Sequence, residues 1–246
     1  MILPSFIQEP VFALIGEECY NSLITNLNIS DTQCTKLVFS KALGIGIVLG
    51  GSLIKLPQVL KIIANGSARG LSFESYVLET IAYAVGLAYN FRQGNPFSTY
   101  GESFFLTIQN IIILLLILKY RGQADRLVVA GLSIVVMSYA LNSSSLINDS
   151  LLAFLQACSI PLSLAAKIPQ IIQNYTNGST GQLSAFAVFG YTLGSMARVF
   201  TTITEVHDPI ILAGFSLATL FNAVLALQMV VYWNAVDDAV IVKKKE

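Results

Sequence analysis

The tetrapeptide Lys-x-Pro-Gln occurs twice in this chain, and each copy ends a long apolar stretch. The copies occupy residues 55–58 and 167–170, so they are separated by 112 residues. The match continues at the same separation, since Asn65-Gly66-Ser67 is repeated as Asn177-Gly178-Ser179. A charge and a helix-breaking proline are both costly inside an apolar helix, so their recurrence indicates an internal duplication.

Composition places this duplication in a membrane. Of the 246 residues, 54% are hydrophobic and 11% are charged, which leaves too few polar side chains to cover a surface in water. The zero net charge gives no sign of binding to nucleic acid. A helix needs about 20 mostly apolar residues to cross membrane lipid. The sequence predicts seven such spans, at residues 40–62, 73–91, 101–119, 127–141, 150–173, 184–203 and 210–233.

Seven spans constrain how the two repeats are arranged. If a repeat has three helices, one extra helix must precede the second copy for it to enter the bilayer from the same side. The sequence therefore predicts an all-α membrane protein in which a linker helix joins two parallel three-helix repeats, with a cavity between them. The predicted units are a tail at 1–36, repeat 1 at 37–121, the linker helix at 122–147, repeat 2 at 148–236 and a tail at 237–246.

The distribution of lysine and arginine predicts the orientation of these spans. With the N-terminus placed on the lumenal or external side, eight basic residues face the cytosol and three face the opposite side, which favours a cytosolic C-terminus. The cytosolic set is Lys61, Arg69, Lys119, Arg121, Arg126, Lys243, Lys244 and Lys245, and the opposite set is Lys36, Lys41 and Arg92.

Two cysteines fall in the N-terminal tail. Cys19 and Cys34 could form a disulfide in an oxidising compartment, although their spacing alone does not show that the sulfur atoms meet. Asn28 lies between them and begins a possible glycan acceptor motif.

Two Pro-Gln motifs, each ending the first helix of a three-helix repeat in a chain of seven spans, resemble the PQ-loop family, and in particular its endoplasmic-reticulum branch. The resemblance covers residues 18–236 and is most specific at residues 41–48, 55–59, 120–123, 180–185 and 232–235. It implies a protein of the endoplasmic reticulum membrane that is needed when lumenal glycosyltransferases consume dolichol-phosphate mannose and dolichol-phosphate glucose, in N-glycan and GPI-anchor assembly.

The end of the chain has a feature of its own. Lys243 and Lys244 lie four and three places from the carboxyl terminus, which resembles the dilysine retrieval signal that a cytosolic coat reads on resident proteins of the reticulum. The alternative interpretation is a basic anchor that ends the last helix at the membrane surface.

The Lys-x-Pro-Gln motif predicts a bend in the helix. Pro57 and Pro169 each lack a backbone donor and exclude the carbonyl four residues earlier, so we expect a hinge at these positions. Gln58 and Gln170 could satisfy the opened backbone or contact a passing molecule.

Lys55 and Lys167 need a separate explanation, because an ammonium group inside a membrane is costly. One explanation is that both side chains extend to the cytosolic surface. The other is that they face the cavity as paired cations for an anionic group, such as the phosphate of a dolichol-phosphate sugar.

The remaining polar residues inside the spans are also open to two interpretations. Thr107 with Asn110, and Thr219 with Asn222, share a helical face and could line a polar pathway or hold neighbouring helices together. Glu79 and Arg198 could form a buried ion pair or a coupling site. His207, with Glu205 and Asp208, is expected in a solvated loop rather than in a metal site.

These residues predict a protein that is not an enzyme and needs no cofactor, since the sequence contains no catalytic triad, P-loop or dinucleotide fingerprint. The leading hypothesis is a factor that makes dolichol-phosphate-linked monosaccharides usable in the lumen, either by translocating the head group or by presenting the lipid to transferases. The alternative is a facilitative transporter of free sugars or other small solutes, as in the SWEET branch of the family.

Overall fold

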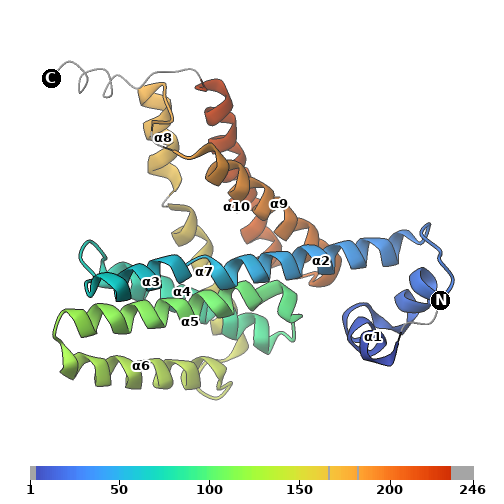
Figure 1. Ribbon diagram of the computed structural model, residues 1–246, viewed down its shortest axis with the longest axis horizontal. Coiled ribbons are helices and arrows are strands. Elements are labelled where there is room, and N and C mark those ends of the chain that lie inside the picture. The colour runs from blue at the N-terminus through green and yellow to red at the C-terminus, as the bar shows by residue number, and fades with distance from the viewer. Residues whose placement is uncertain (1–3, 166, 182, 234–246) are drawn as a thin grey trace.

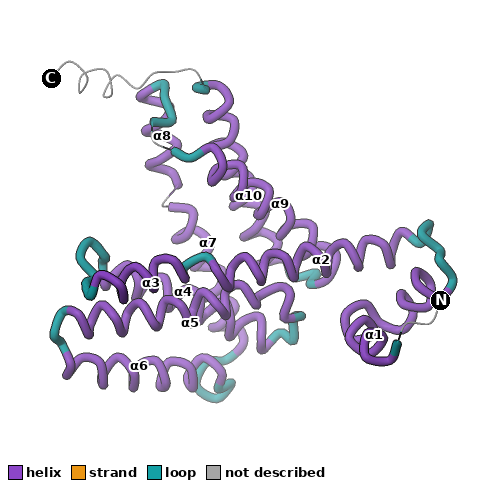
Figure 2. The backbone as a smooth tube through the Cα atoms, viewed as in Figure 1, coloured by secondary structure: helices purple, strands orange, loops and turns teal. Residues whose placement is uncertain are grey.

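The structure, a computed structural model, describes residues 4–165, 167–181 and 183–233. Every regular element within these residues is a helix (Figure 2). In chain order they are α1 (Ser5–Tyr20), the π-helical turn η1 (Asn21–Thr25), α2 (Thr32–Leu53), α3 (Leu56–Asn65), α4 (Phe73–Arg92), α5 (Phe97–Tyr120), α6 (Ala124–Asn142), α7 (Asp149–Ala165), α8 (Lys167–Asn177), α9 (Ala185–Glu205) and α10 (Pro209–Val231).

Each of the seven predicted spans falls on a helical segment. By length and composition, five segments are apolar enough to cross a membrane: Thr32–Asn65, Phe97–Tyr120, Asp125–Asn142, Asp149–Asn177 and Pro209–Val231. The second helices of the repeats are α4, with 20 residues, and α9, with 21 residues, and both are less apolar than these five segments. The predicted all-α membrane fold is confirmed.

Equivalent residues begin and end equivalent helices in the two repeats. The hydroxyls of Ser72 and Ser184, which are 112 residues apart, accept hydrogen bonds from backbone amides in the first turns of α4 and α9. Gly66 and Gly178, also 112 residues apart, follow α3 and α8 with φ of 55° and 57°, a left-handed conformation that glycine adopts readily. The duplicated sequence therefore specifies the same local structure twice.

The helices of each repeat pack in the same order. In repeat 1 the third helix, α5, packs against both α2 and α4, and in repeat 2 the third helix, α10, packs against both α7 and α9. Between repeats, α2 contacts α9 and α4 contacts α7, so the first helix of each repeat meets the second helix of the other. These reciprocal contacts are what a twofold relation between the repeats requires.

The two repeats separate toward α3 and α8. Figure 1 shows α8 standing away from α3, whereas α9 and α10 reach α2. Apolar clusters hold each region together, with Ile62 and Ile117 packed between α3 and α5, and Val188 and Leu225 packed between α9 and α10. The helix α6 packs beside α4 and α5.

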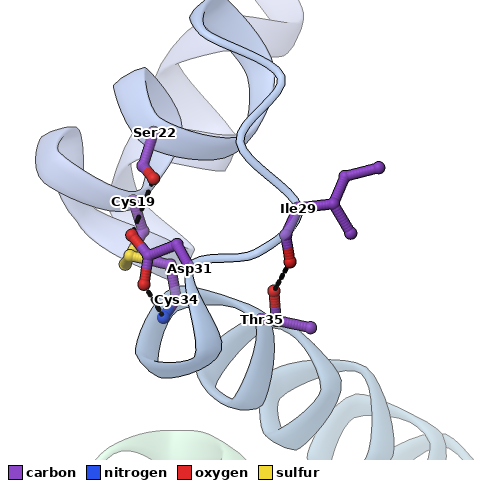
Figure 3. Close-up of a disulfide and its surroundings, with 6 residues drawn as sticks. All are labelled: Cys19, Ser22, Ile29, Asp31, Cys34 and Thr35. Atoms are coloured by element: carbon purple, nitrogen blue, oxygen red, sulfur yellow. Dashed lines mark hydrogen bonds between the residues drawn. A yellow bond between two sulfur atoms is a disulfide. The ribbon is translucent and has the colours of Figure 1, made fainter.

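The N-terminal tail is linked covalently to the start of α2. Cys19 and Cys34 form a disulfide, as expected for an oxidising compartment (Figure 3). Beside it, Asp31 caps α2 by accepting hydrogen bonds from the Ser22 hydroxyl (2.6 Å) and the Cys34 amide (3.1 Å). These bonds, the one from Ser22 foremost, lower the pKa of Asp31 below its ordinary value. The retrieval residues Lys243 and Lys244 lie outside the described residues.

Candidate functional site

The first helix of repeat 1 is broken at its Lys-x-Pro-Gln motif, since α2 ends at Leu53 and α3 begins at Leu56. In repeat 2 the residue between α7, which ends at Ala165, and α8, which begins at Lys167, lies outside the described residues, so the hinge expected at Pro169 stays a prediction. Pro57 occupies the first turn of α3, where a missing backbone donor costs little. Gln58 lines a surface pocket, and Gln170 lines a cavity described below.

A side chain from α5 satisfies the backbone at the break in repeat 1. The Gln109 amide nitrogen donates to the Gly51 and Ser52 carbonyl oxygens, both at 3.0 Å, and its oxygen accepts from the Lys55 amide at 2.8 Å. Gln109 is buried, so these three bonds replace the helical bonds lost at the break. In repeat 2, Gln228 from α10 donates to the Ile171 carbonyl at 2.9 Å.

Lys55 is fully compensated within repeat 1. Its Nζ lies 2.7 Å from Glu79 Oε2 and 2.7 Å from Asn110 Oδ1, and it lies 5.2 Å from the centre of the Tyr76 ring. The Tyr83 hydroxyl donates to the other oxygen of Glu79 at 3.0 Å. The charge of Lys55 is therefore neutralised within repeat 1 by Glu79.

Among the described residues, Lys167 has an amide partner but no acidic one. Its Nζ donates to Asn222 Oδ1, while Asn222 Nδ2 donates to the Tyr191 carbonyl (3.0 Å) and to Ser195 Oγ (3.1 Å). Tyr191 follows Glu79 by 112 residues, so the position that supplies a carboxylate in repeat 1 supplies a tyrosine in repeat 2. Within the described part of the chain, no carboxylate lies within ion-pair distance of Lys167.

The sequence-based pairing of Glu79 with Arg198 is wrong. Arg198 Nη2 lies 2.9 Å from Glu102 Oε2, and Nη1 donates to the Ser98 carbonyl at 2.8 Å. Glu79 instead pairs with Lys55. Arg198 is carried by α9 and Glu102 by α5, so the pair joins repeat 2 to repeat 1.

A second inter-repeat ion pair involves Glu205, which was expected in a solvated loop. Its side chain is 3% exposed, and it accepts from Lys41 Nζ at 2.6 Å, from Ser98 Oγ at 3.1 Å and from Ser40 Oγ. Asp208 caps α10 and accepts from the Tyr89 hydroxyl at 2.7 Å. The loop prediction was therefore wrong for Glu205, which ends α9, whereas Asp208 does lie in the connection between α9 and α10 and is partly buried there. Only the position of Glu205 at the end of an apolar stretch signalled a structural role in the sequence.

Three cavities adjoin one another along repeat 2 and the interface between the repeats. The first, of about 240 Å³, is lined by Lys167, Gln170, Tyr191 and Asn222. The second, of about 540 Å³, shares Tyr191 and Asn222 with the first and also contains the Arg198–Glu102 pair. The third, of about 280 Å³, shares Phe215 and Ala218 with the second and lies among α4, α5, α7 and α10. A continuous lining thus connects Lys167 to the contact between α4 and α7.

Comparison with known proteins agrees with the duplicated architecture. A profile described as PQ loop repeat matches residues 39–99 and 151–211, and the two matches start 112 residues apart. The chain is also 30% identical over 171 residues to human "Solute carrier family 66 member 3". The aligned region covers 69% of this chain and 82% of that protein. The chain belongs to the PQ-loop repeat family.

The polar side chains expected to line a pathway in this PQ-loop protein divide into two groups. Asn222 lines the first and second cavities. Asn110 is fully buried against Lys55, and Thr107 and Thr219 donate to carbonyls of their own helices, those of Ser103 and Phe215. The polar residues therefore occupy equivalent positions in the two repeats, but of the two equivalent asparagines only Asn222 lines the first two cavities.

Proposed function

We propose that this PQ-loop protein is a membrane carrier that binds an anionic group at Lys167 and moves it along the cavities next to and between its repeats. The observation that carries the proposal is the difference between the two motif lysines. Lys55 is neutralised by Glu79, whereas Lys167 lines a cavity and has only an amide as its partner among the residues that the structure describes.

An uncompensated ammonium group inside a membrane is costly, and a bound anion removes that cost. The first cavity offers further groups to such a ligand, since Gln170, Ser184 and Tyr191 line it together with Lys167. One free cation fits a ligand with one negative charge, which revises the expectation that two lysines act as a pair.

The substrate proposed for this site is a dolichol-phosphate-linked mannose or glucose, used in the lumen of the endoplasmic reticulum. Such a lipid carries one phosphodiester charge, which matches a single lysine. The second cavity is bordered by exposed apolar side chains, including Ile54 and Phe186, so a lipid chain can remain in the bilayer while its head group enters. The resemblance to the mannose-P-dolichol utilization defect 1 protein, carried by the five stretches named in the sequence analysis, supports this substrate.

Movement and presentation of the lipid are separated by reconstitution. Purified protein in liposomes, without transferases, is given a mannosyl isoprenyl phosphate labelled in its sugar, and the label that becomes accessible on the opposite leaflet is measured. Head-group movement above that of protein-free liposomes supports a carrier. Binding without movement contradicts the carrier and favours presentation to lumenal glycosyltransferases.

A second candidate is a facilitator of soluble solutes, favoured by the similarity to a protein named as a solute carrier. For this function, uptake of a soluble anion or sugar by the same liposomes is expected to exceed movement of the lipid-linked probe. Replacement of Asn222, which lines two cavities, is expected to abolish that uptake.

A further inference from the structure

The second and third cavities occupy equivalent places in the duplicated structure. The second lies where α2 meets α9 and the third lies where α4 meets α7, which are the two reciprocal contacts between repeats. Their linings differ in charge at matched positions. Arg198 and Glu102 form an ion pair in the second cavity, and the residues 112 positions away from them are Gly86 and Gly214 in the third.

Loss of the ion pair leaves the third cavity uncharged but polar. No charged residue is found among its described lining residues, which include Tyr83, Asn90, Thr99, Ser103 and Gln156. The hydroxyl and amide groups of these residues can both donate and accept hydrogen bonds. An anion finds no counter-charge here, so the lining suits a neutral ligand with several hydroxyl groups.

One amide in this cavity lacks a partner. Gln156 Oε1 is buried and accepts no hydrogen bond from the described residues. The amide lies beside α4, since a Cβ added at Gly86 would be in van der Waals contact with Gln156 Oε1, at 3.5 Å. A buried acceptor without a donor is costly, and a ligand hydroxyl would offset that cost.

We propose that the third cavity binds an uncharged polyhydroxylated ring of the hexose type. The inference deepens the proposed function, on which it rests in part, by assigning the anionic group to Lys167 and the sugar ring to the space between α4 and α7. The volume of about 280 Å³ lies at the small end of ligand pockets, which are about 300–1,000 Å³, so the space suits one ring rather than a whole lipid.

The test compares two phosphodiester probes of equal charge. Affinities of the full chain in nanodiscs are measured for mannosyl isoprenyl phosphate and for methyl isoprenyl phosphate, which carries a methyl group in place of the mannose, and D-mannose is tested separately as a competitor. Gln156→Leu removes the unpaired acceptor and Gly86→Val fills the cavity. Gly131→Val is the matched control, because a Cβ at Gly131 meets nothing within 4 Å.

The wild type and Gly131→Val are expected to prefer the mannosylated probe by at least about tenfold, and both cavity variants are expected to lose that preference while still binding methyl isoprenyl phosphate. Competition by D-mannose identifies a free sugar as a ligand, and its absence assigns the site to the lipid-linked sugar alone. A preference for the mannosylated probe that survives in Gln156→Leu overturns the proposal. This variant decides the test by itself if Gly86→Val fails to fold. If no probe with a phosphate binds but D-mannose still binds through Gln156, the result contradicts the proposed function and leaves the sugar site standing.

Discussion

At the scale of residues, the two copies of one motif have different electrostatic surroundings. Lys55 meets Glu79, whereas Lys167 meets only Asn222 within the described ranges, because the position equivalent to Glu79 is Tyr191. The sequence predicted that both lysines matter but not which carboxylate each would meet. That choice depends on packing between helices that are far apart in the chain, and spacing along one helix carries no information about it.

Lys55→Gln is expected to lower stability because it leaves Glu79 without its cation. The cost is roughly 1–3 kcal/mol, below that of a fully buried pair, because the Glu79 side chain is 37% exposed. Lys55→Gln combined with Glu79→Gln is expected to recover most of the loss. Thermal unfolding in detergent measures both variants, and a double variant as unstable as the single one would contradict the pairing.

The lowered pKa of Asp31 predicts that the stability of the protein depends on pH. Hydrogen bonds from Ser22 and Cys34 lower its pKa in the folded state. Its carboxylate therefore contributes stability that is fully present above the unfolded pKa of about 3.9 and is lost as the pH falls through the folded value. The difference in melting temperature between wild type and Asp31→Asn is expected to be constant above about pH 5 and to shrink below about pH 4. A difference that does not change with pH would refute this role.

At the scale of elements, proline predicted a break in the first helix of each repeat, and the structure confirms the break at the motif of repeat 1. The sequence did not indicate how the freed backbone groups are satisfied there. Gln109 satisfies them from α5, and the residue 112 positions later is Phe221, whose side chain forms no such hydrogen bonds. Symmetry in the sequence was therefore a poor guide to this contact, because the residue that makes it is not repeated.

Gln109→Leu is expected to destabilise the protein, since it leaves the buried Gly51 carbonyl, the partly buried Ser52 carbonyl and the Lys55 amide without their partner at the break. Each unsatisfied group costs roughly 1–3 kcal/mol, so the melting temperature in detergent should fall clearly. Gln173→Leu, at an exposed position on α8, is the control and should have little effect. Equal melting temperatures for the two variants would show that Gln109 does not stabilise the break.

At the scale of the whole molecule, the duplication predicted the membrane fold, and both the helix order and the PQ loop repeat matches agree with it. The ionic links between repeats were not predicted. Arg198 pairs with Glu102 and Lys41 with Glu205, each joining residues about 100 or more positions apart in sequence. These links form where α2 and α5 meet α9, so they follow from how the repeats pack.

The charge on Lys167 is central to this account, and the initial rate of head-group movement in liposomes tests it most directly. Lys167→Gln is compared with the wild type and with the Lys55→Gln, Glu79→Gln double variant, using mannosyl isoprenyl phosphate as the probe. Because a hydrogen bond to a charged group contributes about 1.5–3 kcal/mol, Lys167→Gln should slow movement roughly 10-fold to 100-fold, with the double variant near the wild type. A correctly folded Lys167→Gln protein that moves the probe at the wild-type rate would contradict the account.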